Sequence, residues 1–238
     1  QIKDVLIITK KEDLKSFKSL LGNGRKLGMK ISYTIQEKPK GIADAFIIGE
    51  KFIGESNCAL ILGDNIFYGQ NFSEKLLSAK SRQNGATIFS YPVHDPQRYG
   101  VVELDKKNNP IKIVEKPKVP KSNLAVTGLY FYDNQIVNIA KSLKLSKRGE
   151  LEITDVNKVY LKKKKLYMES FGRGFAWLDT GTPESLLTAN IFIANIEQRQ
   201  GLKIACLEEI TYLNKWISKL KLKKLTNAMS SGPYKDYL

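Results

Sequence analysis

Apolar runs and amphipathic stretches alternate along the first third of the chain. Apolar segments at 5–8, 31–36 and 58–62 predict strands, and apolar residues at helical spacing over 12–21, 42–53 and 72–83 predict the helices between them. Alternation of strands and helices is typical of a parallel sheet covered by helices on both faces. The pattern therefore indicates an α/β fold.

The pattern changes after a further apolar strand at 87–93. Residues 99–104 and 111–115 flank a turn-rich connection around Asn108, Asn109 and Pro110, so we expect them to pair as a β-hairpin. Further strands are predicted at 125–132, 166–171 and 176–179, and helices at 134–143, 152–161 and 183–199. We expect a main domain over residues 1–200 and a lysine-rich helical extension over 201–238.

The apolar run at 59–62 stops abruptly at Gly63, Asp64 and Asn65. A short apolar run that ends at glycine predicts a strand buried on both faces, as in parallel sheets, and ligands bind beyond the carboxyl ends of such strands. A carboxylate there, beside a glycine that lets backbone approach closely, suits a divalent cation and its phosphates. A strand-ending turn with a solvated aspartate explains the same residues equally well.

Composition narrows the function classes. The 238 residues are 42% hydrophobic and 10% aromatic, which is ordinary for a globular protein and argues against disorder. The net charge of +15 is unusual, and its positive residues are densest at 162–165 and 215–224. A phosphate-rich ligand, nucleic acid or an anionic surface would suit this charge, but a solvated lysine face is the simpler explanation. The basic runs lack interleaved aromatics and any known DNA- or RNA-binding signature, which argues against nucleic acid.

The cysteines and the N-terminal residues bear on the cellular compartment of the protein and on whether the chain is part of a longer one. Cys58 and Cys206 are far apart and have no metal-type or redox-type partner nearby. No run is long enough to span a membrane and no leader opens the chain, so we expect a cytoplasmic protein. Gln1 is not an initiator and a buried strand begins almost at once, so we expect the chain to be a fragment of a longer protein.

Several segments carry groups suited to a phosphorylated ligand. Gln36 offers an amide that can read a base edge, and Gly41 opens a helix whose backbone N–H groups can meet a phosphate. Glu115 can accept hydrogen bonds from sugar hydroxyls, and Lys116 can hold a phosphate. A structural explanation remains open for each: Gln36 as a solvated loop residue, for example, and Glu115 with Lys116 as a surface ion pair.

Two aspartates close separate predicted strands. Asp64 and Asp179 could share a Mg²⁺ that also binds phosphate oxygens, although their sequence separation alone does not show that they meet. Gly100, after Tyr99, offers backbone that can lie against a sugar. A turn at Tyr99 and Gly100, and a helix cap at Asp179, are the structural alternatives.

The order of these segments changes their interpretation. The succession QEKPKGIADAF, LILGDNIFYG, RYGVVE, IVEKP, VTGLYFY, RGELEITDVN and GFAWLDTGT resembles the sugar-1-phosphate nucleotidylyltransferases over about residues 4–209. LGDNIFYG, AVTGLYFYDN and AWLDTGT resemble the glucose-1-phosphate thymidylyltransferase branch in particular. The resemblance implies a Rossmann-like nucleotidyltransferase fold: a mostly parallel mixed sheet flanked by helices, with a small β insertion and a C-terminal helical extension.

The resemblance also implies a reaction. A dTMP group passes from dTTP to α-D-glucose 1-phosphate, giving dTDP-glucose and pyrophosphate, by Mg²⁺-assisted in-line attack without a covalent enzyme intermediate. The protein then contributes positioning and charge neutralisation. A homotetramer that serves dTDP-sugar (dTDP-rhamnose) and polysaccharide biosynthesis is implied as well.

The family's functional positions transfer to single residues here. The resemblance implies nucleotide contacts at Gln36, Gly41, Asp64 and Asn65, and sugar contacts at Gly100, Glu115, Lys116 and Val126, with Tyr99 and Trp177 as pocket walls. It implies Mg²⁺ ligands at Asp64 and Asp179, which form the catalytic set with Lys116. Gly69, Arg173 and Glu209 match positions near a regulatory site for a downstream dTDP-sugar.

One signature of the family is absent. The glycine-rich loop GGxGTRLxP, with a lysine shortly after it, precedes the strand equivalent to 5–8 in the family and does not occur in these residues, so the first strand is expected to be missing. Loss of one charge-stabilising group costs on the order of 10²–10³ in rate. We therefore expect the 238-residue chain by itself to release no pyrophosphate.

Other functions fit the same residues. A uridylyltransferase or another sugar-1-phosphate nucleotidylyltransferase would use the same positions, and a non-catalytic nucleotide-sugar-binding or assembly module would keep the pocket without turnover. A basic nucleic-acid binder rests only on charge and predicts tight, steeply salt-dependent duplex binding.

Overall fold

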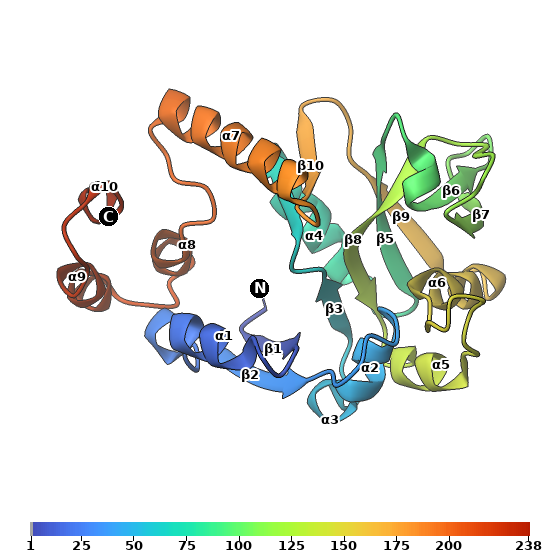
Figure 1. The fold of residues 1–238 in the computed structure, drawn as a ribbon, viewed down its shortest axis with the longest axis horizontal. Coiled ribbons are helices and arrows are strands. Elements are labelled where there is room, and N and C mark those ends of the chain that lie inside the picture. Colours follow the sequence, from blue (N-terminus) through green and yellow to red (C-terminus); the bar gives the residue numbers. More distant parts are fainter. Residues whose placement is uncertain (1) are drawn as a thin grey trace. The chain divides into compact units, whose positions relative to one another are not determined.

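The computed structural model describes residues 2–238 as two compact units (Figure 1). The first unit combines the N-terminal residues up to Lys38 with residues 190–238, and the second is Pro39–Ala189. The domains expected at 1–200 and 201–238 remain a prediction. Gln1, on which the expectation of a longer protein partly rests, lies outside the described residues. No helix within residues 2–238 is long and apolar enough to cross a membrane.

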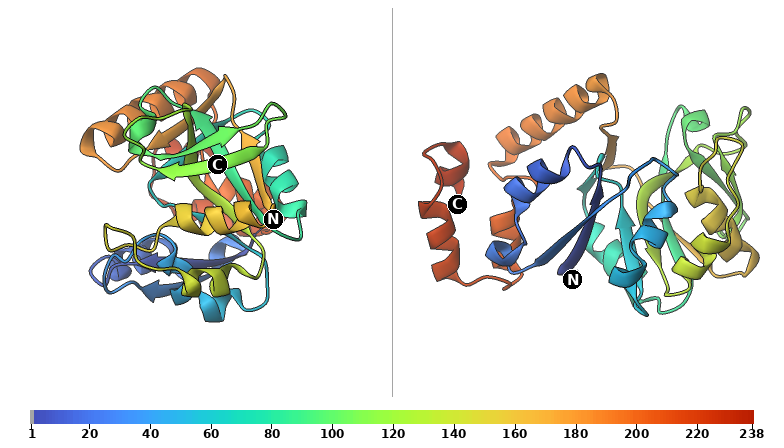
Figure 2. Two further views of the ribbon diagram at one scale, coloured as in Figure 1. Left: turned by 90° about the vertical axis from the view of Figure 1, so that its right-hand side faces the viewer. Right: turned by 60° about the horizontal axis from the view of Figure 1, so that its bottom comes forward.

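The first unit is built on a parallel strand pair (Figure 2). Strands β1 (Asp4–Thr9) and β2 (Lys30–Ile35) pair in parallel, as the strand–helix–strand order predicts. The connection between them contains the predicted helix α1 (Leu14–Leu21) and a short 3₁₀ turn, η1 (Arg25–Leu27). The C-terminal part of the unit adds the predicted helical tail as three helices: α8 (Leu207–Leu213), α9 (Lys219–Asn227) and α10 (Pro233–Tyr237). Two tyrosine hydroxyls tie α10 to α8, from Tyr234 to Glu208 and from Tyr237 to Glu209.

The second unit is built on a curled sheet in the strand order β7-β6-β8-β5-β9, with β3 also paired to β8. Its strands are β3 (Cys58–Ile61), β5 (Ala86–Pro92), β6 (Gly100–Leu104), β7 (Pro110–Glu115), β8 (Leu124–Tyr132) and β9 (Leu166–Ser170). The expected β6–β7 hairpin is confirmed. The helices are α2 (Asp44–Ile48), α3 (Glu50–Ile53), α4 (Phe72–Ser81), α5 (Ile136–Ser142) and α6 (Ile153–Lys162), with a 3₁₀ turn η2 (Pro96–Arg98), and α7 (Pro183–Gln200) begins in this unit and ends in the other. The single helix predicted at 42–53 is interrupted at Gly49.

A hydrophobic core packs against each face of this sheet. On one face, Phe46 of α2, Ile136 of α5 and Val156 of α6 pack in a core with Val126 and Tyr130 of β8. On the other face, Leu129 of β8 packs with four further residues: Phe89, Ala79 of α4, Phe171 and Phe175. Because successive side chains of a strand point to opposite faces, β8 contributes to both cores. The α/β layering predicted from the sequence is confirmed.

Two predicted details of the sheet are wrong. Within the described six-stranded sheet only β5 and β9 pair in parallel, so that sheet is mixed but mainly antiparallel. Strand β3 is not buried on both faces: it pairs antiparallel with β8, and Ile61 is 56% exposed. The physical reason is that an apolar run specifies neither the direction of a strand nor the elements that cover its two faces; both depend on the partners that the chain brings alongside.

A further strand was not predicted at all. Residues Asn65–Gly69 form β4, which pairs antiparallel with β10 (Phe175–Asp179) as a separate two-stranded ribbon. The register places Asp179 opposite Asn65 and Phe175 opposite Gly69. A Cβ on Gly69 would lie 2.3 Å from Cδ2 of Phe175, so glycine allows the two strands to meet there.

Candidate functional site

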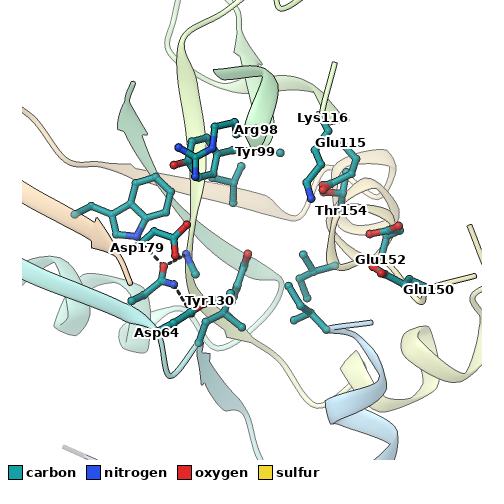
Figure 3. A pocket seen from close by; sticks show the side chains of 18 of the residues that line it. Asp64, Arg98, Tyr99, Glu115, Lys116, Tyr130, Glu150, Glu152, Thr154 and Asp179 are labelled. Atoms are coloured by element: carbon teal, nitrogen blue, oxygen red, sulfur yellow. Dashed lines mark hydrogen bonds between the residues drawn. The ribbon is translucent and has the colours of Figure 1, made fainter. Parts of the chain in front are cut away.

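A cleft of about 650 Å³ lies within the second unit. It is lined by the turn between β3 and β4, the start of β6, the end of β7, the middle of β8, the segment before α6 and the end of β10 (Figure 3). Most of the residues predicted for the pocket line it: Asp64, Asn65, Tyr99, Gly100, Glu115, Lys116, Val126, Trp177 and Asp179. Residues from distant segments of the sequence, from Ile42 to Asp179, therefore line one cavity.

The pairing of β4 with β10 brings the two predicted aspartates together. Thr180 donates to the carbonyl oxygen of Asp64 from its backbone N (2.8 Å) and from its hydroxyl (2.9 Å). A Cβ placed on Gly181 would lie 3.1 Å from Oδ1 of Asp179 and 3.6 Å from Oδ2 of Asp64. Both carboxylates thus reach the same small region, on one side of the cleft (Figure 3).

These two carboxylates limit what the site can bind. Within residues 2–238 no group of three or more His, Cys, Asp or Glu side chains could hold a metal ion. Two carboxylates are too few for an all-protein metal cage. They do suit Mg²⁺, which keeps waters and is commonly held by one or two carboxylates together with substrate phosphates.

The opposite side of the cleft carries Glu115 and Lys116 (Figure 3). The hydroxyl of Thr154 donates a short hydrogen bond to Oε2 of Glu115 and so fixes that carboxylate. Lys116 has a backbone φ of +42°, which is rare for a residue with a side chain, and its N–H donates to the carbonyl of Tyr99 (3.0 Å). Backbone held in such a region is often found at functional sites.

An arginine organises the acidic residues next to Glu115. Arg148 Nη2 lies 2.8 Å from Oε2 of Glu152, 3.1 Å from Oε2 of Glu150 and 3.8 Å from Oε1 of Glu115. Burial alone would raise the pKa of Glu152, but hydrogen bonds from Arg148 and Ser146 outweigh it and hold the pKa below its ordinary 4.5. The hydrogen bond to Glu152 also raises the pKa of Arg148. Arg148 and Glu152 therefore form a charged, hydrogen-bonded pair at neutral pH.

Aromatic rings form a further wall. The rings of Tyr99 and Trp177 lie 5.1 Å apart at an angle of 58°. The guanidinium of Arg98 stacks 5.5 Å from the Tyr99 ring and donates to Asp95. Burial raises the pKa of the Tyr99 phenol, against the opposing effect of Arg98. Each ring offers a flat apolar face of the kind that packs against a sugar ring.

Other predicted residues lie elsewhere. Gln36 belongs to the first unit, where its backbone N–H donates to the carbonyl of Thr9 (3.0 Å). Gly41 belongs to the second unit and is not among the residues that line the cleft; its φ is +98°, and a Cβ there would lie 2.4 Å from the carbonyl oxygen of Leu151. Packing thus explains this glycine, and the thymine contacts of Gln36 and Gly41 remain predictions.

The expected regulatory residues are divided between the units. Gly69 and Arg173 lie in the second unit and Glu209 in the first, where its carboxylate accepts from the Tyr237 hydroxyl (2.8 Å). Their common site remains a prediction.

Several lining residues were missed by the sequence analysis. They are the polar and charged lining residues Arg98, Tyr130, Arg148, Glu150, Glu152 and Thr154. A signal existed in the segment RGELEITDVN, where Glu150, Glu152 and Thr154 recur at every second position and would share one face of an extended chain.

Comparison with known proteins agrees with the site. A family model described as nucleotidyl transferase matches residues 1–196. A glucose-1-phosphate thymidylyltransferase of Neisseria meningitidis is 53% identical over 100% of this chain and 82% of its own length, and one of Xanthomonas campestris is 48% identical over 100% and 80%.

Solved structures resemble the chain as well. A crystal structure from Bacillus anthracis, described as a glucose-1-phosphate thymidylyltransferase in complex with a sucrose, has a TM-score of 0.71 and 41% identity, covering 80% of this chain and 76% of that one. A UDP-glucose pyrophosphorylase in complex with UDP-glucose shares the fold at a TM-score of 0.68 and 24% identity, covering 81% of each chain.

Proposed function

Because the chain belongs to the nucleotidyl transferase family, and within it to the glucose-1-phosphate thymidylyltransferases, we propose that it transfers dTMP from dTTP to α-D-glucose 1-phosphate. The products are dTDP-glucose and pyrophosphate. The observation that carries this proposal is the convergence of Asp64 and Asp179 in a cleft whose other side presents Lys116 and Glu115.

The reaction sets the demands on the cleft. A phosphate oxygen of glucose 1-phosphate attacks the α-phosphorus of dTTP and forms a new P–O bond. The bond from that phosphorus to the oxygen bridging to the β-phosphate breaks, and pyrophosphate leaves with the bonding electrons. Nucleophile and electrophile are both anionic, so the protein must align them and neutralise charge.

Asp64 and Asp179 would hold a Mg²⁺ in this cleft. Their two carboxylates fit that ion because both reach one region and leave the remaining coordination to phosphates and water. When bound, Mg²⁺ would withdraw negative charge from the phosphate oxygens. The hydrogen bonds of Thr180 to the Asp64 carbonyl hold the two strand ends at this spacing.

The opposite side of the cleft would receive glucose 1-phosphate. Lys116 supplies a cation for the sugar phosphate, and Glu115, oriented by Thr154, accepts hydrogen bonds from sugar hydroxyls. Tyr99 and Trp177 would cover a face of the sugar, with Gly100 and Val126 as close neighbours. Arg148 neutralises part of the acidic cluster, which keeps that side compatible with a phosphorylated ligand.

The setting of the enzyme forms part of the proposal. A cytoplasmic homotetramer serving dTDP-sugar biosynthesis would match the expectations drawn from the sequence. Light scattering during size-exclusion chromatography measures the oligomeric state directly.

Pyrophosphate release from dTTP and glucose 1-phosphate, with the protein as encoded by its gene, tests the function. We expect turnover with dTTP above that with UTP, and a fall in kcat/KM of on the order of 10² or more for Asp64→Asn and for Asp179→Asn. Asp105→Asn is the matched control, because Asp105 lies in the exposed β6–β7 turn and accepts hydrogen bonds from Lys107 and Asn109. Full activity in both site variants would contradict the roles given to the two aspartates.

A further inference from the structure

The side chain of Asn65 joins three parts of the cleft. Its Oδ1 accepts hydrogen bonds from the backbone N of Gly128 (3.0 Å) and from Nε1 of Trp177 (2.7 Å). Its Nδ2 donates to Oδ1 of Asp64 (2.8 Å). The acceptor capacity of the amide is thus filled by protein donors, and one amide hydrogen is given to the aspartate.

The strand pairing explains why these groups meet. Asn65 is directly opposite Asp179 in the β4–β10 ladder, and Trp177 is two residues before Asp179 on the same strand. Residues at every second position of a strand share a face, so Asn65, Trp177 and Asp179 lie on the same side of the ribbon. Asn65 is therefore within diagonal reach of the indole.

Gly128 makes room for the amide on the neighbouring strand β8. A Cβ at position 128 would lie 2.5 Å from Oδ1 and 2.8 Å from Cγ of Asn65. The hydrogen bond from the Gly128 N–H is possible only because no side chain occupies this space. The arrangement therefore depends on three segments that are distant in the sequence.

We propose that Asn65 is a positioning residue that sets the orientation of the Asp64 carboxylate and of the Trp177 indole together. The inference rests on the proposed function, because Asp64 is taken as a metal ligand and Trp177 as the sugar wall. Donation to Oδ1 of Asp64 leaves Oδ2 directed to the region beside Gly181 that Asp179 also reaches. Residues that orient metal-ligating carboxylates commonly change metal affinity or activity by 10–100-fold when they are replaced.

The orientation of Trp177 is measurable without substrate or metal. The chain contains two tryptophans, Trp177 and Trp216, and Trp216→Phe assigns their indole N–H resonances in a ¹H–¹⁵N spectrum. We expect Asn65→Ala to shift the Trp177 resonance and to accelerate its hydrogen exchange, because the N–H loses its acceptor. Asn57→Ala is the matched control: Asn57 is an exposed asparagine whose amide donates to the carbonyl of Gln83 (3.0 Å). An unmoved Trp177 resonance in folded Asn65→Ala would overturn the proposal.

Kinetic measurements separate the effect of Asn65 on Asp64 from its effect on Trp177. We expect Asn65→Ala to raise the Mg²⁺ concentration for half-maximal rate by roughly tenfold and to raise the KM for glucose 1-phosphate. In a Trp177→Phe background the Mg²⁺ effect should persist, because it acts through Asp64, while the KM effect of Asn65→Ala should disappear. Unchanged Mg²⁺ dependence and KM together with a lowered melting temperature would mean a merely structural role and would overturn the proposal.

A second variant protects the test from misfolding. Asn65→Ser is smaller and cannot reach all three partners, so the same changes are expected if Asn65→Ala does not fold. If the unsubstituted protein as encoded by its gene releases no pyrophosphate, the proposed function fails, and the indole spectrum still decides whether Asn65 orients Trp177.

Discussion

Gly128→Ala tests whether the geometry of the cleft depends on the space left for the Asn65 amide. The added Cβ would lie 2.5 Å from Oδ1 of Asn65 and 2.8 Å from Cδ1 of Leu62, closer than real Cβ contacts come. The φ of Gly128 lies outside the left-handed region, so alanine is allowed by the backbone and the cost is steric. Asn65 must move, and it loses the hydrogen bonds from Gly128 and Trp177.

The magnitude follows from these contacts. Two hydrogen bonds contribute about 1 kcal/mol each, and overpacking costs about 1–3 kcal/mol. The lower entropy of the unfolded alanine chain offsets about 0.4–1 kcal/mol. We therefore expect a loss of roughly 2–4 kcal/mol in the free energy of unfolding, which corresponds to a fall of roughly 5–15 °C in melting temperature for a chain of this size.

Urea unfolding and thermal melting measure this loss, and two further variants make the test specific. Gly172→Ala is the control, since a Cβ at Gly172 meets nothing within 4 Å and its φ is likewise outside the left-handed region. Gly128→Ala combined with Asn65→Ala should lose less than the two single losses together, because truncation of Asn65 removes the atoms that clash. Equal stability of Gly128→Ala and Gly172→Ala, or strict additivity in the double variant, would refute the reasoning.

Two further predictions concern packing and pH. Gly41→Ala should lower the free energy of unfolding by at least about 1 kcal/mol more than Gly54→Ala does. Both glycines have positive φ, so both substitutions strain the backbone, but only at Gly41 would the added Cβ meet backbone, at 2.4 Å from the Leu151 carbonyl oxygen. Equal urea midpoints for the two variants would disprove this. Glu152→Gln should cost roughly 1–2 kcal/mol near pH 7, a modest value since the Arg148 side chain is 42% exposed. The pKa of Glu152 is lowered in the native state, so its contribution is present above the ordinary value of 4.5 and is lost as pH falls through the lower native value. A stability difference that stays constant from pH 7 to pH 3 would count against the Arg148–Glu152 pairing.

Local periodicity was enough to place most elements of the fold. The amphipathic helix α4 and the β6–β7 hairpin were predicted because helical spacing and turn residues are local features. Strand β4 was not predicted, because its five residues are all partly buried and show no alternation, and its partner β10 is distant in the sequence. The direction of β3 was missed because its partner β8 is likewise distant in the sequence.

Some residues of the candidate site were likewise predicted from the sequence, and others were missed. Asp64, Glu115 and Lys116 were found because charged residues that follow apolar strands point to a ligand-binding edge. Arg148 and Thr154 were not found, because a charged or hydroxyl residue between elements is ambiguous until its neighbours are known. The structure supplies those neighbours: Glu152 for Arg148, and Glu115 for Thr154.

The sequence by itself determined most of the helices and strands, the chemical types available at the strand ends and the family that their order resembles. These depend on residues close together in the chain, where period and burial are encoded directly. Only the tertiary structure decided that the Asp64 and Asp179 carboxylates reach one region. The same holds for the hydrogen bonds of the Asn65 amide with Trp177, Gly128 and Asp64, and for the packing that requires glycine at positions 41 and 69. Those facts arise from pairing between distant segments, and a local pattern carries no information about which distant segment lies alongside it.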